Sequence, residues 1–184
     1  MRAGWNNVVL ACLLAAWMVP AGAALPEPEA GLWQLEPEVR MNGQNVSQMV
    51  GALRAPRQVC VSAEDARMMA DPERALALWG GSLAEKGCVV DRLSVAGSTL
   101  NFAGACRGEG SVFQGDVDGE LVYHSRRHVS GKLLGKGMPA LGGWAEALRG
   151  AAQAAGQTLR TELKVQMQWQ GAACGDAPAI GGKR

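Results

Sequence analysis

The sequence predicts a mainly β protein: an antiparallel curled sheet, or a barrel-like or sandwich layer, of about six to eight strands with two short helical excursions. Three observations predict this fold class. Apolar and polar positions alternate over residues 159–170, as in a strand with one dry face and one wet face. Short connections containing glycine join further segments of the same kind. Helical spacing is confined to residues 63–79 and 139–155.

The strands follow one another along the chain in the same alternating pattern. They are expected at residues 33–41, 58–61, 89–95, 99–106, 113–123, 128–134 and 159–170. Pro37 lies inside the first of these and cannot donate a hydrogen bond to a neighbouring strand, so this strand is predicted to be an edge strand or to carry a bulge. Asp118-Gly119 is a hairpin dipeptide, which leaves open whether residues 113–123 form one bulged strand or two short strands.

Capping signals define the first helical excursion. Ser62 with Asp65 three residues later is a helix start signature, and Asp71 followed by Pro72 begins a second helix. Gly80-Gly81 is expected to end that helix near Trp79. The other excursion, over residues 139–155, carries Trp144 in its apolar stripe and is expected to lie on the sheet.

The chain is expected to have one folded domain between two short ends. Residues 1–23 resemble a secretory signal peptide, with Arg2 before an apolar run and Ala21-Gly22-Ala23 at the cleavage site. The apolar run is too short for a stable membrane anchor, and lipidation at Cys12 is the weaker alternative. We expect a lead-in linker over 24–30, a single disulfide-bonded β domain over 31–175 and a mobile tail over 176–184.

Four cysteines remain after the signal peptide is removed. An even set in an exported chain indicates two disulfides, and the absence of Cys-x-x-Cys spacing argues against a metal site. Four cysteines allow three pairings, among which the sequence does not choose. We favour Cys60 with Cys88, which would close the helical excursion, and Cys106 with Cys174, which would tie the last strand to a central hairpin.

The charge distribution excludes one class of partner. The chain holds 18 Lys and Arg residues against 17 Asp and Glu residues, and the two signs are interleaved along every segment. A nucleic-acid-binding surface needs a basic excess on at least one face. We therefore predict no nucleic acid partner.

The residues with catalytic potential do not form a recognisable site. His124 and His128 would lie about 13 Å apart within one strand, too far to share a metal ion, although a hairpin turn would bring them nearer. Arg126 and Arg127 between them would oppose a bound cation, so we predict two surface histidines, no metal and no cofactor. Asp116 and Glu120 form an acid pair on one strand, the basis of an alternative function as a secreted hydrolase.

Several motifs, taken in order, resemble those of a known family. They are Gly31-Leu32-Trp33, Cys60-Val61-Ser62-Ala63-Glu64-Asp65, Gly87-Cys88 with the hairpin at 95–100, Cys106, Gly119-Glu120-Leu121 and Cys174. The chain resembles the domain-of-unknown-function 3617 family of exported bacterial proteins over nearly all of its length after the signal peptide. The resemblance implies a small periplasmic β domain and no particular activity. The chain departs from the family pattern in its helical segment at 138–157 and in its Gly171-Ala172-Ala173-Cys174 ending.

Together these features predict a non-catalytic periplasmic module that binds a small apolar ligand or an envelope protein. Met68, Trp79 and Trp144 are the candidate contact residues, because they lie on the two helical excursions near the expected mouth of the sheet. Core packing is the commoner role for such residues. Trp33 and Trp169, on the dry faces of their strands, are expected to belong to the core.

Overall fold

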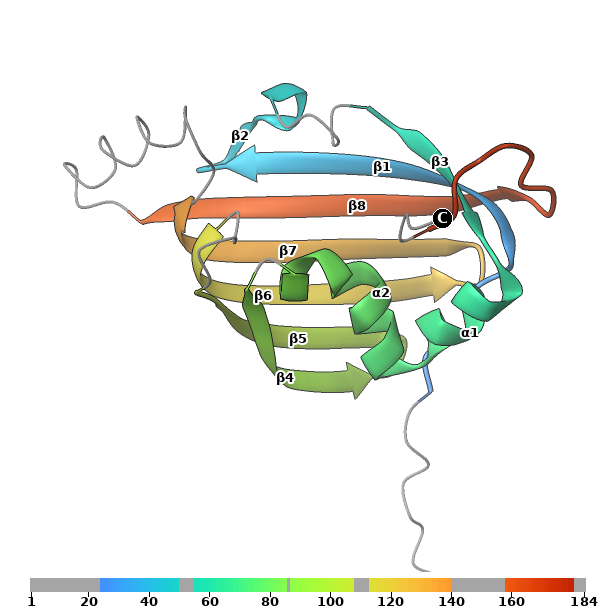
Figure 1. Ribbon diagram of the computed structural model, residues 1–184, viewed down its shortest axis with the longest axis horizontal. Helices are drawn as coiled ribbons and strands as arrows, with labels where there is room; N and C mark the ends of the chain where they lie inside the picture. Colours follow the sequence, from blue (N-terminus) through green and yellow to red (C-terminus); the bar gives the residue numbers. More distant parts are fainter. Residues whose placement is uncertain (1–23, 50–54, 86, 108–112, 140–157, 181–184) are drawn as a thin grey trace, which may run out of the picture.

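The computed structural model describes residues 24–49, 55–85, 87–107, 113–139 and 158–180. They form one antiparallel eight-stranded sheet in the order β2-β1-β8-β7-β6-β5-β4, with β3 also paired to β1. The strands are β1 (Gly31–Met41), β2 (Gln44–Asn45), β3 (Arg57–Val61), β4 (Cys88–Ala96), β5 (Thr99–Cys106), β6 (Phe113–Ser125), β7 (His128–Pro139) and β8 (Leu159–Gly171). The sheet is not closed into a barrel, since β4 ends its order on one side (Figure 1). The predicted mainly β, antiparallel class is thus confirmed.

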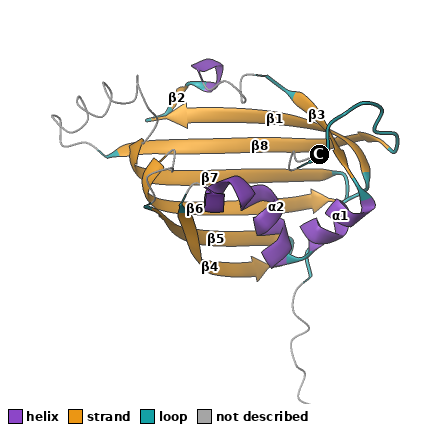
Figure 2. Cartoon of the chain, in the orientation of Figure 1, coloured by secondary structure: helices purple, strands orange, loops and turns teal. Residues whose placement is uncertain are grey.

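The helices lie over one face of this sheet. They are α1 (Ala63–Ala70) and α2 (Pro72–Glu85), and a 3-10 turn covers Ser47–Met49. Figure 2 shows both α-helices in front of the strands, and Tyr123 of β6 donates a hydrogen bond from its hydroxyl to the Met69 carbonyl of α1 at 2.6 Å. The main core lies between these layers, and its largest fully buried side chains include Trp33, Tyr123, Met69 and Leu100. The prediction that Trp33 is a core residue is confirmed.

Pro37 marks a gap in the pairing of β1. On the outer side of β1, β3 pairs with residues 31–35 and β2 pairs with residues 40–41. Pro37 falls between these two ladders and is paired only on its inner side, with Val165 of β8. Proline is tolerated here because its ring nitrogen faces a position where no strand needs a donor. The predicted edge character holds at this residue, and the irregularity of the β1–β8 ladder lies elsewhere, between Leu32 and Trp33.

The capping signals position both helices correctly, but one predicted helix end is wrong. Ser62 and Asp65 form a reciprocal capping box at the start of α1, and Asp71 accepts a hydrogen bond from the Arg74 backbone at the start of α2. Helix α2 continues through Gly80 and Gly81 to Glu85 instead of ending near Trp79. Glycine lowers helix propensity by only about 1 kcal/mol, which packing of the helix on the sheet can outweigh.

The central hairpins follow the predicted pattern, with one clarification. β4 and β5 are joined at Gly97, which adopts a positive φ of 61°. β6 is a single strand through Asp118-Gly119, so the dipeptide does not form a turn. Gly119 lies opposite Phe102 in the ladder, and a Cβ at Gly119 would clash with the Phe102 ring. The glycine is therefore needed to make room for an aromatic side chain.

The four cysteines form two disulfides, but the favoured pairing was wrong. The bonds join Cys60 to Cys174 and Cys88 to Cys106. Cys88 and Cys106 are direct partners across the β4–β5 hairpin. Because α1 and α2 carry the chain from β3 at one side of the sheet to β4 at the opposite edge, Cys60 and Cys88 lie far apart. The sequence pattern gave no indication of this crossing.

Both ends of the described chain are attached to the sheet. In the lead-in at 24–30, Leu25 is only 3% exposed, and the Glu29 carbonyl accepts a hydrogen bond from the Trp33 indole. At the other end, the backbone of Cys60 hydrogen-bonds with Pro178 and Ile180 on either side of a parallel bridge to Ala179. The expected linker and mobile tail thus both include residues that pack on the fold. Their contacts are made by backbone groups and isolated side chains, which have no periodic signal.

Two predicted segments fall largely outside the described residues. The signal peptide at 1–23 is one of them. The other is the helical excursion predicted at 139–155, of which only Pro139 is described, at the end of β7.

Candidate functional site

Strand β4 forms a free edge of the sheet and carries exposed apolar side chains. Among the described residues, Val89 and Leu93 are the large apolar side chains that remain exposed, at 68% and 37%, and both belong to β4. The β4–β5 ladder shifts register between Val90 and Arg92, so Asp91 and Arg92 interrupt the alternation of the strand. Bulges and charges of this kind limit edge-to-edge pairing with another sheet.

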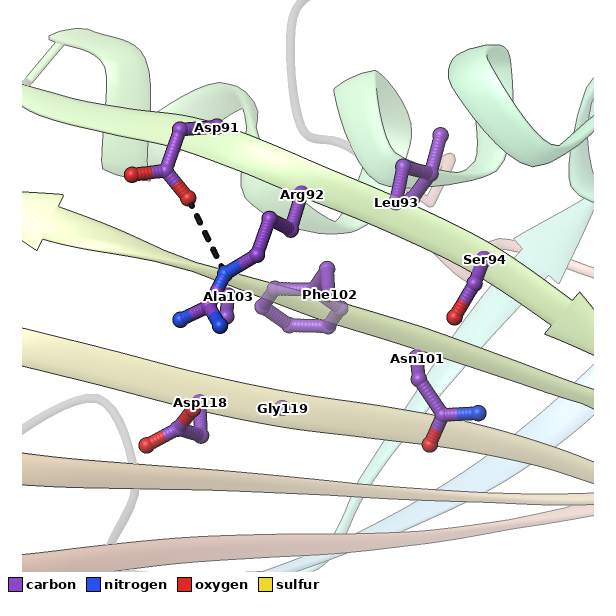
Figure 3. A pocket seen from close by; sticks show the side chains of 9 residues that line it. All are labelled: Asp91, Arg92, Leu93, Ser94, Asn101, Phe102, Ala103, Asp118 and Gly119. Carbon is purple, nitrogen blue, oxygen red and sulfur yellow. Dashed lines mark ion pairs between the residues drawn. The ribbon is translucent and has the colours of Figure 1, made fainter.

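A hollow of ≈ 680 Å³ adjoins this edge, and we call it the edge hollow. Figure 3 shows its lining, which comes from β4, β5 and β6: Asp91, Arg92, Leu93, Ser94, Asn101, Phe102, Ala103, Asp118 and Gly119. Its volume is in the range of small-molecule sites. The lining combines an apolar centre with charged groups at the rim, where Arg92 Nε lies 3.5 Å from Asp91 Oδ1.

The packing of Phe102 shapes the apolar centre of the edge hollow. Phe102 is 9% exposed and lies against Gly119, while its ladder partner Leu93 is partly open to solvent. Because the glycine leaves no side chain beside the ring, the backbone of β6 becomes part of the hollow wall. The arrangement offers a ligand an aromatic edge, an aliphatic side chain and nearby polar groups.

Of the contact residues predicted from the sequence, Met68 is not part of the lining of the edge hollow, and the other two cannot be placed beside it from the described residues. Met68 is half-buried in α1, and its carbonyl accepts a hydrogen bond from the Asp71 backbone. Trp79 lies in α2, but its side chain is outside the described part of the structure, and Trp144 lies wholly outside it. The sequence signal that could have identified the edge hollow is the broken alternation at Asp91-Arg92, which is typical of a bulged edge strand.

Trp169 has a different environment from that of Trp33, although the two are ladder partners. Trp169 is partly buried, and its indole donates a hydrogen bond to the Ala30 carbonyl. The Arg127 guanidinium lies 4.5 Å from the centre of its ring, within the range of a cation–π contact. Trp169 therefore packs at the margin of the core, and its hydrogen bond links the lead-in to β8.

The face of the sheet opposite to the helices is polar and carries ion pairs between strands. Glu162 of β8 lies 3.4 Å from Lys164 Nζ and 3.5 Å from Lys132 Nζ of β7. Burial acts to raise the pKa of the Glu162 carboxyl, but the two ammonium groups outweigh it and the pKa is lowered. Asp116 and Glu120 are aligned with Lys136 and Lys132 in the β6–β7 ladder.

The structure brings the two histidines together. A turn at Arg126 and Arg127 joins β6 to β7, and the imidazole rings of His124 and His128 stack with their centres 4.4 Å apart. The distance estimated for one straight strand therefore does not apply. Among the described residues, no group of three or more His, Cys, Asp and Glu side chains is arranged to hold a metal ion.

These features define a small β protein with an open antiparallel sheet held by two disulfides. The chain belongs to the family described as "Protein of unknown function (DUF3617)", which it matches over residues 28–174. No curated protein and no solved structure is similar enough to the chain to count as a match. Within the described residues, no helix is long and apolar enough to cross a membrane.

Proposed function

We propose that this protein is a non-catalytic periplasmic binding module and that it holds a small, largely apolar ligand in the edge hollow. The observation that carries the proposal is that Leu93, a large apolar side chain that remains exposed, lines this hollow beside Phe102. Apolar surface left exposed next to a concavity commonly marks a binding site. The charged rim would orient a polar group of the ligand.

The alternative function, a hydrolase that uses Asp116 and Glu120, has less support. Asp116 is exposed, and each carboxylate has a lysine as its ladder partner. A general acid usually needs burial or a like-charged neighbour to keep its proton near neutral pH. Neither Asp116 nor Glu120 is buried, since Ser47 is the residue classed as buried and polar among those described. A pair of lysine-matched surface acids is better explained as part of the charged outer face.

Native mass spectrometry of the protein purified from its own periplasm tests the proposal. We expect a retained small-molecule mass in the wild type that is lost in Leu93→Ser, because Leu93 lines the edge hollow. Val89→Ser is the matched control, since Val89 is an apolar residue of the same strand but is not part of the lining. We expect this control to retain the ligand.

Two outcomes would contradict the proposal. Loss of a bound protein in both variants would indicate an envelope partner on the β4 edge instead of a small ligand. Turnover of a periplasmic extract by the wild type, abolished in Asp116→Asn or Glu120→Gln, would favour the hydrolase.

A further inference from the structure

We propose that the ligand held in the edge hollow carries a protonated amine beside its apolar part, and that this amine pairs with the Asp118 carboxylate. The inference rests on the proposed function and adds to it the charge of the ligand. Asp118 belongs to the lining of the edge hollow and is exposed, so a ligand can reach it. The class of ligand is therefore an apolar molecule with an ammonium group.

Asp118 lies where two hollows of the surface meet. The second hollow has a volume of ≈ 220 Å³ and is lined by Asn101, Asp118, Gly119, Glu120, Lys132 and Leu134. The first three of these residues also line the edge hollow. A ligand that extends from one hollow into the other would therefore lie across Asp118.

The neighbouring strands give Asp118 no cationic partner. The acidic residues two positions before and two positions after it in β6 are each aligned with a lysine of β7. Asp118 itself is aligned with Leu134 of β7 and with Ala103 of β5. Among the described residues, Asp118 takes part in no ion pair. Its carboxylate thus lies between two apolar side chains, with its charge available to a ligand.

The cations that line the two hollows are already paired with other carboxylates. Arg92 Nε lies 3.5 Å from Asp91 Oδ1 (Figure 3), and Lys132 Nζ lies 3.5 Å from Glu162 Oε1. The lining of the edge hollow holds two carboxylates and one guanidinium, so its net charge is negative. Such a site favours a cationic group over an anionic one. The side-chain amide oxygen of Asn101, which lines both hollows, is a further acceptor for an ammonium group.

Calorimetric titration of the disulfide-intact exported protein at neutral pH, with octylamine, octanoate and octanol as probes, tests the proposal. We expect the wild type to bind octylamine at least about fivefold more tightly than either other probe, because only the amine can pair with Asp118. Asp118→Asn keeps the shape of the side chain and should lower the affinity for octylamine to that for octanol. Asp116→Asn is the matched control, since Asp116 lies in the same strand but lines neither hollow, and it should keep the preference.

The three probes separate failure of this inference from failure of the proposed function. Equal binding of all three by the wild type, or an unchanged preference for octylamine in Asp118→Asn, would overturn the pairing with an amine. If Leu93→Ser then weakens every probe, the apolar site itself stands, because Leu93 lines the edge hollow. Tighter binding of octanoate would assign the polar group of the ligand to Arg92 and would also overturn the inference. Failure of every probe to bind would contradict both the inference and the proposed function.

Discussion

The two sides of the sheet are held in different ways. At the β1 side, β3 and β8 both pair with β1, the segment at 178–180 hydrogen-bonds with β3, and the Cys60–Cys174 bond links positions 114 residues apart. At the β4 side, the Cys88–Cys106 bond spans only 18 residues and joins strands that are already paired. The long-range contacts hold the fold together, while the local hairpin leaves a strand edge and a hollow accessible.

Removal of the long-range disulfide should have the largest effect. We expect Cys60→Ala with Cys174→Ala to lower the free energy of unfolding by about 4 to 5 kcal/mol, because this bond restricts the larger loop of the unfolded chain. The matched variant, Cys88→Ala with Cys106→Ala, should lose about 3 kcal/mol. Denaturant unfolding measures both values. An equal or larger loss in the second variant would remove the distinction between the two sides.

Truncation of Trp33 in the core should cause the second-largest loss of stability. Trp33 is fully buried, and we expect Trp33→Ala to lower the free energy of unfolding by about 3 to 5 kcal/mol. Its ladder partner Trp169 is the control, because it is only partly buried and Trp169→Ala should cost less. If thermal and denaturant unfolding show a larger loss of stability for Trp169→Ala than for Trp33→Ala, the core does not lie around Trp33.

The hydrogen bond between sheet and helix should have an intermediate effect. Tyr123→Phe removes the hydroxyl that satisfies the Met69 carbonyl and should lower the free energy of unfolding by about 1 to 3 kcal/mol. We expect backbone amides of α1 to exchange faster with deuterium in this variant. Burial also raises the pKa of the Tyr123 hydroxyl, so its ultraviolet titration should begin above the usual range near 10. A normal titration would show that the hydroxyl is exposed.

The ion pairs of the polar face should have the smallest effect. The pKa of Glu162 is lower in the folded chain than the value of about 4.3 in an unfolded chain, so its stabilising contribution is present above that pH and is lost as the pH falls further. We expect Glu162→Gln to cost at most about 1 kcal/mol at neutral pH and nothing in strong acid. Unfolding measured between pH 2 and 7 checks this, and a pH-independent loss would contradict it.

The sequence predicted most of the sheet because alternation and capping are local signals. Ser62 with Asp65 and Asp71 with Pro72 begin the two helices as expected, and the long alternation of β8 identifies both of its faces. The disulfide pairing could not be predicted in this way, since it depends on where two helices carry the chain across the sheet. The end of α2 was also missed, because the glycines at 80 and 81 are tolerated inside the helix.

The candidate sites were harder to predict for a related reason. Met68, Trp79 and Trp144 were selected by residue type, whereas the edge hollow arises from a bulge at Asp91-Arg92 and a glycine beneath Phe102. The proximity of His124 and His128 depends on a two-residue turn that reverses the chain. In each case the arrangement comes from contacts between strands, which a single sequence does not specify.

Hydrogen–deuterium exchange of the native protein tests the difference between the two sides most directly. We expect the amides of β1 and β8 to be the most protected, because these strands are paired with each other and with further strands. Amides of β4 that do not pair with β5 should exchange quickly. Equal protection of β4 and β1 would show that the β4 edge is covered, and it would contradict an open edge beside the edge hollow.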